Sequence, residues 1–591
     1  MLATMNMQTI AQMSCNPAMG GVAKGQIVRE VDALGGYSGI VTDHTMIQFR
    51  MLNRSKGPAM WSPRAQSDRM LFAGKWRKML EENTQIDFWQ EMVTGLVVKG
   101  GRVRGVRTGM GIEIESESVV LTNGTFLNGL IHIGDKQFGG GRAGERAATG
   151  ITEQLVELGF EAGRMKTGTP PRIDGRSLNW DAMELQPGDE TPGKFSYTDT
   201  PRLKKQRPCH IAYTSKEVHD VLKTGFDRSP MFNGRIRGIG PRYCPSIEDK
   251  IERFADRDRH QLFVEPEGWD TVEIYVNGFS SSLPEDVQYK ALRKIVGFEN
   301  AKMFRPGYAI EYDFFQPTQL KISLETRLIK NLFFAGQING TTGYEEAACQ
   351  GLMAGINASL AVKEEEPFVL KRSDAYIGVL IDDLVNKGTK EPYRMFTSRA
   401  EYRILLRQDN ADIRLTPIAK ELGMLHLDER MEKVTTKVEQ ERVLTSFFKK
   451  LSAEPTLVNP FLETIGSKPL DQKVKMNMVI LRPNVGIKEL RKYVPELDTF
   501  LQDYDEDVIF LAETTLKYEG YIRKEEEMVA KMNRLEAVKL KEGTDYHELE
   551  SLSAEAREKL SQLQPRTIGQ ASRISGVSPA DISVLLVHMG R

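Results

Sequence analysis

The chain has 591 residues and nearly equal numbers of basic (80) and acidic (81) side chains, giving a formal net charge of −1. That balance excludes a chain-wide field for a polyanion, so any nucleic-acid contact must come from a local patch. Four cysteines, none in a C-x-x-C pair, argue against a disulfide scaffold and against a structural metal site. No apolar run reaches membrane-spanning length and no signal-peptide pattern is present. We therefore expect a cytoplasmic protein of several domains, without a metal.

The first 36 residues combine a short strand-like segment, a glycine-rich loop and an amphipathic helix. Residues 1–7 read as the end of a strand, and Cys15 begins the loop C-N-P-A-M-G-G. Ile27, Val31 and Leu34 then share one helical face, which Gly35 ends. Cys15 is a candidate nucleophile, because open backbone N–H groups beside a loop cysteine favour its thiolate; an inert loop cysteine is an equal alternative.

Residues 86–125 predict a β-meander that ends in the apolar strand at 119–121, followed by Thr122-Asn123-Gly124. This order is characteristic of flavoproteins with two dinucleotide-binding domains, in which the last strand rejoins a parallel sheet. A helix is expected near 149–158. The stretch 164–172 has three basic residues, two prolines and no apolar period, so it predicts a rigid surface loop that either faces an anion or is simply solvated.

Residues 173–300 predict an insertion into the sheet domain. Within it, Pro245 suits the first position of a helix, and the acidic residues that follow favour the positive end of its dipole. Cys244 would then lie at the helix N-terminus with Arg242 nearby, two features that activate a thiol. Cys244 is therefore the best nucleophile candidate, and a small buried cysteine that caps a helix is the alternative.

The stretch from Leu332 to Gly351 predicts a buried strand, a glycine-rich turn and a helix. Such a unit directs free backbone N–H groups and a helix dipole at an anion such as a pyrophosphate. The alternative is a turn that binds nothing, but extra polar donors favour a ligand. The candidate ligand-binding residues of this loop are Gly336, Gln337, Asn339, Gly340, Thr341, Thr342 and Gly343.

Beyond a charged linker near residue 366 the composition becomes helical. Ser398 to Glu401 resembles a capping box, which predicts a helix carrying arginines at every fourth position. Arginines interleaved with aromatic rings suit a phosphate backbone and unstacked bases, so we expect RNA contact rather than a merely solvated face. The predicted RNA-binding residues are Lys390, Arg394, Arg399, Arg403 and Arg407.

The C-terminal residues 567–581 have the pattern of a helix-turn-helix. The second helix, from Asp581 to Val587, is too apolar to read base edges in a DNA groove. We therefore expect it to pack against a neighbour and disfavour a DNA-binding function.

Taken together, the sequence resembles the MnmG (GidA) family of FAD-dependent enzymes that modify C5 of the wobble uridine of certain tRNAs. The motifs that carry the resemblance lie in family order from Ser14 almost to the C-terminus. They are SCNPAMGG, AKGQIVREVDALGG, SKGPA, GRAG, RMKTGTPPR, GPRYCPSIEDK, RPGYAIEYDFF, FFAGQINGTTGYEEAA, TKEPYRMFTSRAEYR, KYEGYI and GQASRISGVSPADIS.

The resemblance implies an α/β Rossmann-like FAD-binding domain, an inserted α+β domain and an all-α C-terminal region. We place the domains at 1–172 and 301–366 (FAD), 173–300 (NAD and substrate), 367–510 (tRNA) and 511–591 (partner). The resemblance also implies NADH as reductant and methylenetetrahydrofolate as one-carbon donor. It further implies the GTPase MnmE as partner, a homodimer, and a heterotetramer with that partner.

Residue roles carry over on matched positions only. Cys15 and Cys244 match two functionally important cysteines, and Val93 and Gln337 match FAD contacts. A further FAD contact, a serine in the family, falls at Ala148 and is not transferred. The proposed NAD-binding segment comprises Gly240, Pro241, Arg242, Tyr243, Pro245, Ser246, Ile247, Glu248, Asp249, Lys250, Ile251, Glu252, Arg253 and Phe254.

One departure from the family concerns the start of the chain. The family begins with a strand and a G-G-G-H-A-G phosphate loop, a unit of about 30 residues that precedes the residue matching Met1. We expect a chain without this unit to fold imperfectly and to bind FAD poorly.

The expected chemistry begins at uracil C5, which is a weak nucleophile until a thiolate adds at C6. Either Cys244 or Cys15 activates the uridine or carries the one-carbon unit. Two alternatives stay open: a folate- and FAD-dependent tRNA uridine methyltransferase, and a non-catalytic RNA-binding or assembly protein.

Overall fold

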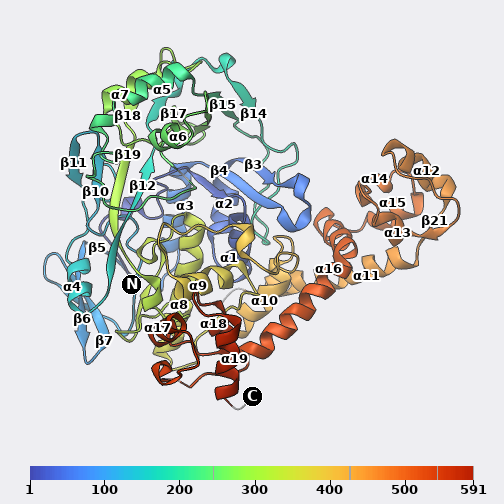
Figure 1. Cartoon of the computed structure of the whole chain (residues 1–591). Coiled ribbons are helices and arrows are strands. Elements are labelled where there is room, and N and C mark those ends of the chain that lie inside the picture. The colour runs from blue at the N-terminus through green and yellow to red at the C-terminus, as the bar shows by residue number, and fades with distance from the viewer. Residues whose placement is uncertain (244, 425–426, 542, 590–591) are drawn as a thin grey trace.

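The computed structural model describes residues 1–243, 245–424, 427–541 and 543–589 (Figure 1). A large α/β body holds the first 400 residues or so, and a helical arm projects from it to the right of the view. A small helical bundle that carries the C-terminus lies against the lower side of the body. This arrangement agrees with the predicted α/β fold with an inserted sheet and a helical C-terminal region.

Two parallel strand pairs form the Rossmann-like part. Strand β1 pairs with β5, and β9 pairs with β20 in the register Val119↔Leu332. The meander β6-β7-β8 leads into β9, so the prediction that the last meander strand rejoins a parallel pair is confirmed. The bounds are β1 (Leu2–Thr4), β5 (Phe88–Gln90), β6 (Val93–Lys99), β7 (Arg102–Thr108), β8 (Glu113–Glu115), β9 (Val119–Leu121) and β20 (Leu332–Phe334).

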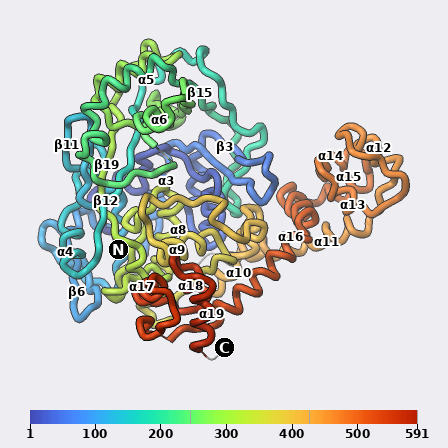
Figure 2. The backbone as a smooth tube through the Cα atoms, in the orientation of Figure 1, coloured from blue at the N-terminus to red at the C-terminus, as the bar shows by residue number. Residues whose placement is uncertain are grey.

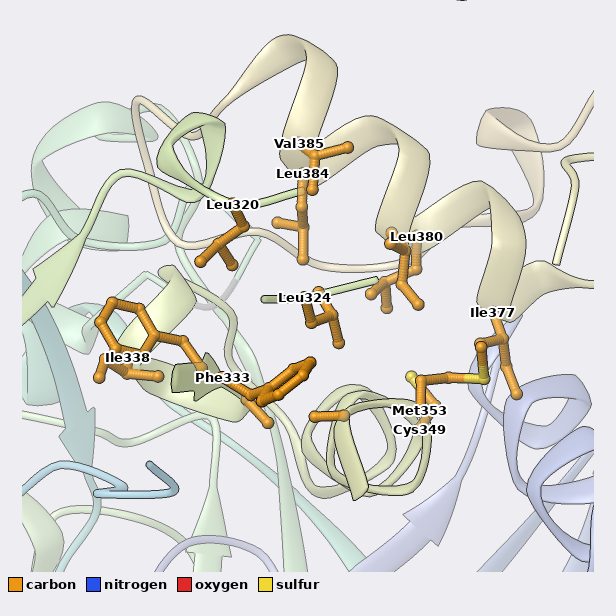
Figure 3. Close-up of a cluster of buried hydrophobic side chains, with 14 of the residues drawn as sticks. Leu320, Leu324, Phe333, Ile338, Cys349, Met353, Ile377, Leu380, Leu384 and Val385 are labelled. Atoms are coloured by element: carbon orange, nitrogen blue, oxygen red, sulfur yellow. The ribbon is translucent and has the colours of Figure 1, made fainter. Parts of the chain in front are cut away.

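Helices cover these strands and form the largest apolar core. Figure 3 shows Phe333 of β20 beside Met353 of α8 and near Leu380 and Leu384 of α9, all of them buried. The predicted helix at 27–34 is α1, and its apolar face packs into this same core. The bounds are α1 (Lys24–Ala33), α4 (Ile151–Glu157), α8 (Tyr344–Val362), α9 (Tyr376–Lys387) and α10 (Ala411–Glu421).

A four-stranded antiparallel sheet stands next to the parallel pairs in the order β11-β10-β19-β12. Its strand β12 contains residues that the sequence assigned to a surface loop, and that prediction is wrong. Eight residues of β12 pair with β19, and Lys166 and Arg172 are buried. The bounds are β10 (Leu130–Ile133), β11 (Lys136–Gly139), β12 (Ala162–Thr169) and β19 (Tyr308–Phe315).

The segment between β12 and β19 builds a six-stranded antiparallel sheet with its own apolar core, in the order β14-β15-β16-β17-β13-β18. Three helices accompany it (Figure 1, top). The bounds are β13 (Arg172–Asp174), β14 (Glu184–Gln186), β15 (Cys209–Tyr213), β16 (Gln261–Pro266), β17 (Glu273–Asn277), β18 (Met303–Arg305), α5 (Lys216–Lys223), α6 (Ile247–Arg253) and α7 (Glu285–Leu292).

A small sheet, β2-β4-β3, follows the Cys15 loop and packs with two helices around a separate apolar cluster. It lies between the six-stranded sheet and α1 (Figure 1). The bounds are β2 (Ala18–Gly20), β3 (Met46–Leu52), β4 (Ser62–Ser67), α2 (Ser38–Thr45) and α3 (Arg69–Glu81).

The arm and the C-terminal bundle are helical, and each has its own apolar core. Figure 2 shows the chain running out along α11 and returning along the long helix α16 to the bundle. The main bounds are α11 (Asp428–Lys450), α12 (Pro455–Thr464), α13 (Met476–Ile480), α14 (Ile487–Leu490), α15 (Pro495–Leu501), α16 (Glu506–Glu536), α17 (Ala554–Leu563), α18 (Ile568–Arg573) and α19 (Pro579–His588); two short strands, β21 (Ser452–Ala453) and β22 (Val474–Lys475), pair in the arm.

The helix predicted from Ser398 onward is absent. Residues 397–399 form a single 3-10 turn, Ala400 is extended, and no α-helix begins before Ala411 in this part of the described chain. In contrast, the two caps predicted near the C-terminus are present: the Thr567 side chain accepts from the N–H of Gln570, and Ser578 forms a capping box with Asp581. Among the described residues no helix is long and apolar enough to cross a membrane.

Candidate active site

A pocket of about 340 Å³ lies where the parallel strands, the four-stranded sheet and the six-stranded sheet meet. We call it the central pocket. Segments far apart in the sequence supply its walls, among them the Cys15 loop, the end of β12 and the loop between β20 and α8. Its lining includes Cys15, Thr167, Tyr275, Gln337 and Arg394. The convergence of these polar side chains on one concave site makes it the candidate active site.

The Cys15 thiol is exposed to this pocket and held by two tyrosines. Its Sγ lies 3.0 Å from the hydroxyl of Tyr275, and either atom can donate. Its backbone N–H donates to the hydroxyl of Tyr344 over 2.9 Å. Tyr275 comes from β17 and Tyr344 from the first turn of α8, so no local pattern near Cys15 could predict either contact. The thiol therefore has a fixed place at the pocket wall.

Arg172 supports this arrangement from below. It is 1% exposed, its Nη2 donates to the carbonyl of Ser14, and its guanidinium carbon lies 4.4 Å from the ring centre of Tyr275. Its charge is balanced by Glu267, which also binds Arg69 over 2.6 Å. Burial alone raises the pKa of Glu267, but the two guanidinium groups hold it below its usual value. Arg172 thus holds both the Ser14 carbonyl next to Cys15 and the Tyr275 ring whose hydroxyl contacts the thiol.

The loop between β20 and α8 supplies the pocket with only some of its predicted residues. Gln337, Thr342 and Gly343 line the pocket. The side chains of Asn339 and Thr341 are buried and donate instead to the carbonyls of Phe334 and Gly336. These two residues hold the loop in shape, so their assignment as ligand donors is not supported by their position.

Three backbone positions of this loop favour glycine. Gly336, Gly340 and Gly343 have φ of +87°, +71° and +123°, where other residues are strained. A Cβ on Gly343 would also lie 2.2 Å from Lys24 Nζ. Glycine therefore lets this loop turn sharply and pack closely against Lys24.

A buried cluster of charges forms the floor beside the loop. Lys24 Nζ lies 3.0 Å from both Glu345 and Glu346 at the start of α8. Burial alone lowers the pKa of Lys24, but the two carboxylates keep it above its ordinary value. Glu345 also accepts from the N–H of Gly20 over 2.7 Å, which joins α8 to the Cys15 loop. Lys24 and Glu345 line the pocket, and the sequence analysis missed both.

Among the described residues of the proposed NAD-binding segment, Pro241 is the one that lines the pocket. Its helix begins at Ile247 and is capped by Ser246, so Pro245 lies before the helix rather than in its first turn. Ile247 and Ile251 are buried in the core of the six-stranded sheet. Glu248 accepts from the N–H and the hydroxyl of Ser282, which makes this part of the helix structural. Cys244 lies outside the described residues.

A second cavity, of about 840 Å³, adjoins the central pocket. It is lined by the ends of β1 and β9 and by Val93, which therefore does not reach the central pocket. Thr125 and Gly141 line the central pocket, whereas their neighbours Phe126 and Arg142 line the large cavity. The two hollows thus share one dividing wall.

The polar groups of the large cavity fit a dinucleotide cofactor. Asn123 Oδ1 and Arg142 Nε are buried without a hydrogen-bond partner in the described part of the chain, and both residues line this cavity. Buried polar atoms rarely stay unpaired, so they indicate a polar ligand. The carboxyl end of a parallel strand is also where α/β folds bind nucleotides.

The five predicted RNA-binding residues do not form a stripe, because no helix carries them. Arg407 is 3% exposed and is paired with Asp409. Arg399 lies 3.6 Å from Asp383 and 4.3 Å from the ring centre of Tyr393. Arg394 lines the central pocket, while Lys390 and Arg403 are exposed. The predicted surface is therefore wrong for Arg407 and keeps Lys390, Arg394 and Arg403 as cations that RNA can reach.

No group of three or more histidine, cysteine, aspartate or glutamate side chains in the described part of the chain has an arrangement that could hold a metal ion.

The fold and its two adjoining hollows define the class first: an α/β protein with a Rossmann-like FAD-binding fold and a helical C-terminal region. The chain belongs to the MnmG/GidA family. The family model described as glucose inhibited division protein A matches residues 1–366, which is more than half of the chain. Models for the MnmG/GidA C-terminal helical domain and helical bundle match residues 428–526 and 528–591.

Individual relatives agree with this assignment. The tRNA uridine 5-carboxymethylaminomethyl modification enzyme MnmG of Cytophaga hutchinsonii is 68% identical over 100% of this chain and 95% of its own length. That of Porphyromonas gingivalis is 56% identical over the same shares. The solved structure of Aquifex aeolicus GidA superposes with a TM-score of 0.89 at 43% identity, covering 100% of this chain and 94% of that one.

Proposed function

We propose that this chain is an FAD-dependent enzyme that modifies C5 of the wobble uridine in tRNA, adding an aminomethyl or carboxymethylaminomethyl group. The observation that carries the proposal is the central pocket itself. There the Cys15 thiol meets Gln337 and the glycine-rich loop of a Rossmann-like fold, in a chain whose family relatives bear the name of this activity.

The chain's own residues can start the reaction at the uracil ring. Addition of the Cys15 thiolate at C6 gives C5 the electron density that it needs to attack a one-carbon electrophile. The exposed thiol gives its proton to water, and the Tyr275 hydroxyl, 3.0 Å from Sγ, can donate a hydrogen bond that stabilises the thiolate before it adds and again when it leaves. Arg172 and Tyr344 keep the thiol in place during both steps. Cys244 is a second candidate for the same role or for carrying the one-carbon unit.

The cofactors follow from the same site. Val93 and Asn123 in the large cavity and Gln337 at the pocket would hold FAD, which when bound and reduced by NADH would supply hydride chemistry. Methylenetetrahydrofolate supplies the carbon. NADH binds near the segment 240–254, of which Pro241 reaches the pocket.

The macromolecular partners use other surfaces. tRNA binds across Lys390, Arg394 and Arg403 beside the pocket. The GTPase MnmE binds the C-terminal helices, and two copies of each protein form a heterotetramer around a homodimer of this chain. The assembly acts in the cytoplasm, where tRNA is found.

The first test measures cofactor binding. FAD is titrated in excess and its fluorescence quenching is followed, before NADH is added to bleach the flavin band. Gln337→Ala is expected to weaken FAD binding several-fold, whereas Gln85→Ala, an exposed residue outside both hollows, leaves it unchanged. Absence of quenching at saturating FAD, with RNA still bound, would favour the non-catalytic alternative.

The second test identifies the product. tRNA is incubated with the chain, FAD, NADH, methylenetetrahydrofolate, an amine donor, MnmE and GTP, and its nucleosides are analysed by mass spectrometry. The proposal predicts an aminomethyl or carboxymethylaminomethyl uridine that depends on MnmE. A methylated uridine formed without MnmE would support the methyltransferase alternative instead.

A further inference from the structure

A pair of aromatic rings, one exposed and one half-buried, stands at the rim of the central pocket. The rings of Tyr243 and Phe396 have centroids 4.4 Å apart and an interplanar angle of 54°. Tyr243 is 57% exposed, so much of its large ring faces solvent and not the apolar core. Its neighbour Pro241 and Phe396's neighbour in space, Arg394, both line the central pocket.

A smaller hollow of about 170 Å³, the side pocket, lies on the other side of the ring pair. Tyr243 itself lines it, together with Lys387, Thr389, Lys390 and Arg399. Three of these side chains are cationic, and Lys390 makes no ion pair within the part of the chain that the structure describes. The cations outnumber the acids Asp383 and Glu391 in the same lining.

One residue of the side-pocket lining carries a buried polar atom without a partner. Thr389 is 5% exposed, and its Oγ1 has no hydrogen-bond partner among the described residues. The same oxygen lies 2.6 Å from where a Cβ on Gly340 would stand, so it faces the loop between β20 and α8. The cations of the lining, rather than this hydroxyl, suit a phosphate group.

We infer that the Tyr243–Phe396 pair stacks an unpaired base of the RNA substrate, and that the side pocket binds the phosphate next to that base. The occupant is a single-stranded nucleotide flanking the uridine that enters the central pocket. Exposed rings interleaved with cations are how proteins hold single-stranded RNA, because every base has a face to stack. The inference rests on the proposed function and specifies which surface holds the flanking nucleotide.

The contacts beside Tyr243 explain how this ring is free to bind a base. Arg242 pairs with Glu391 over 3.0 Å and so ties the two sides of the rim together, while Arg399 donates to the carbonyl of Arg394 within one side. Tyr243 projects from this tied rim into solvent. Its ring can change partner, from solvent to a base, without displacing core packing.

The test compares full-length variants in binding to an anticodon stem-loop RNA, followed by fluorescence anisotropy. Tyr243→Leu is expected to weaken binding about tenfold and Tyr243→Phe to preserve it, since loss of one base–ring stack is felt at this scale. Tyr213→Leu, an exposed tyrosine on the distant strand β15, is the matched control and is expected to bind normally. Lys390→Gln should lower the slope of log K against log salt by about one.

The partner base is located with RNAs that carry a single abasic site. For one such RNA, the affinity of the wild type should be about tenfold lower than its affinity for intact RNA. Tyr243→Leu should bind that abasic RNA and the intact RNA equally well. Equal affinities of wild type and Tyr243→Leu for intact RNA would overturn the inference. The inference would also be overturned if Tyr243→Leu bound RNA normally but bound NADH more weakly, because the ring would then contribute to NADH binding. If wild type itself fails to bind RNA, the proposed function fails first.

Discussion

Arg172 offers the sharpest test of how the site is built, because the sequence placed it on a surface loop and the structure buries it. We consider Arg172→Met, which keeps most of the volume and removes the charge. The guanidinium donates to the carbonyls of Pro170 and Ser14 and to the hydroxyl of Thr169, besides pairing with Glu267. Each of these acceptors loses its donor in the variant.

The expected loss of stability follows from these contacts. Removal of one partner from a buried ion pair destabilises a protein by about 3–5 kcal/mol. Glu267 keeps Arg69 at 2.6 Å, which favours the lower end of that range. The orphaned carbonyls and the lost contact with the Tyr275 ring add to it. Together these terms give a loss of about 4 kcal/mol for the unit that contains β12 and β13.

The assay is native-state hydrogen exchange, since a chain of several domains does not unfold in one step. Protection in residues 162–174 should fall markedly in Arg172→Met and partly in Arg172→Lys, which keeps a charge for Glu267 but loses the planar fork. Arg176→Met is the matched control, because that side chain is 70% exposed and pairs only with its neighbour Asp174. Unchanged protection in Arg172→Met would refute the reasoning.

Three further predictions concern thiols, pH and the C-terminal helices. Iodoacetamide at about pH 8 should label Cys15 but not Cys209 in the folded protein, because burial raises the pKa of Cys209 to about 12. Peptide mass spectrometry measures the labelling, and rapid labelling of Cys209 would contradict the prediction. Burial raises the pKa of Asp43 to about 6 from an ordinary value of 3.8, so the folded state holds that proton more tightly and the resulting stability is lost as pH rises through 6. In urea denaturation, the free energy of unfolding of the wild type should fall by about 1 kcal/mol relative to that of Asp43→Asn between about pH 5 and about pH 7. A difference between the two proteins that does not change with pH would refute this. Arg573→Ala should raise hydrogen exchange in α18, because Arg573 donates to Asp382 of α9 over 2.9 Å and also pairs with Glu536 of α16; Glu558→Ala, an exposed residue, should not.

The sequence alone predicted those elements whose determining residues lie within one short stretch. The strand–turn–helix at 332–351 and the meander at 86–125 were predictable because period, glycines and apolar runs are contiguous in the sequence. The caps at Thr567 and Ser578 were predictable for the same reason.

The remaining parts of the site depend on contacts between distant segments. Tyr275 meets Cys15 across 260 positions, and Glu345 meets Lys24 across 321. No period or spacing in one stretch encodes such pairs. The arginine stripe near residue 400 was wrongly predicted for a different reason. A four-residue spacing indicates a shared face only if the backbone is helical. Here residues 397–399 form a single 3-10 turn, Arg399 pairs with the distant Asp383, and Arg407 pairs with its near neighbour Asp409.

The measurement that tests the central claim most directly is nucleoside analysis of tRNA after reaction with cysteine variants in excess FAD. Wild type and Cys209→Ser should both yield the modified wobble uridine, because Cys209 is buried away from the pocket. Cys15→Ser should bind FAD and tRNA as before yet yield none, because the hydroxyl is a far weaker nucleophile toward C6 than the thiolate. Normal modification by Cys15→Ser would show that the thiol in the central pocket does not carry the reaction.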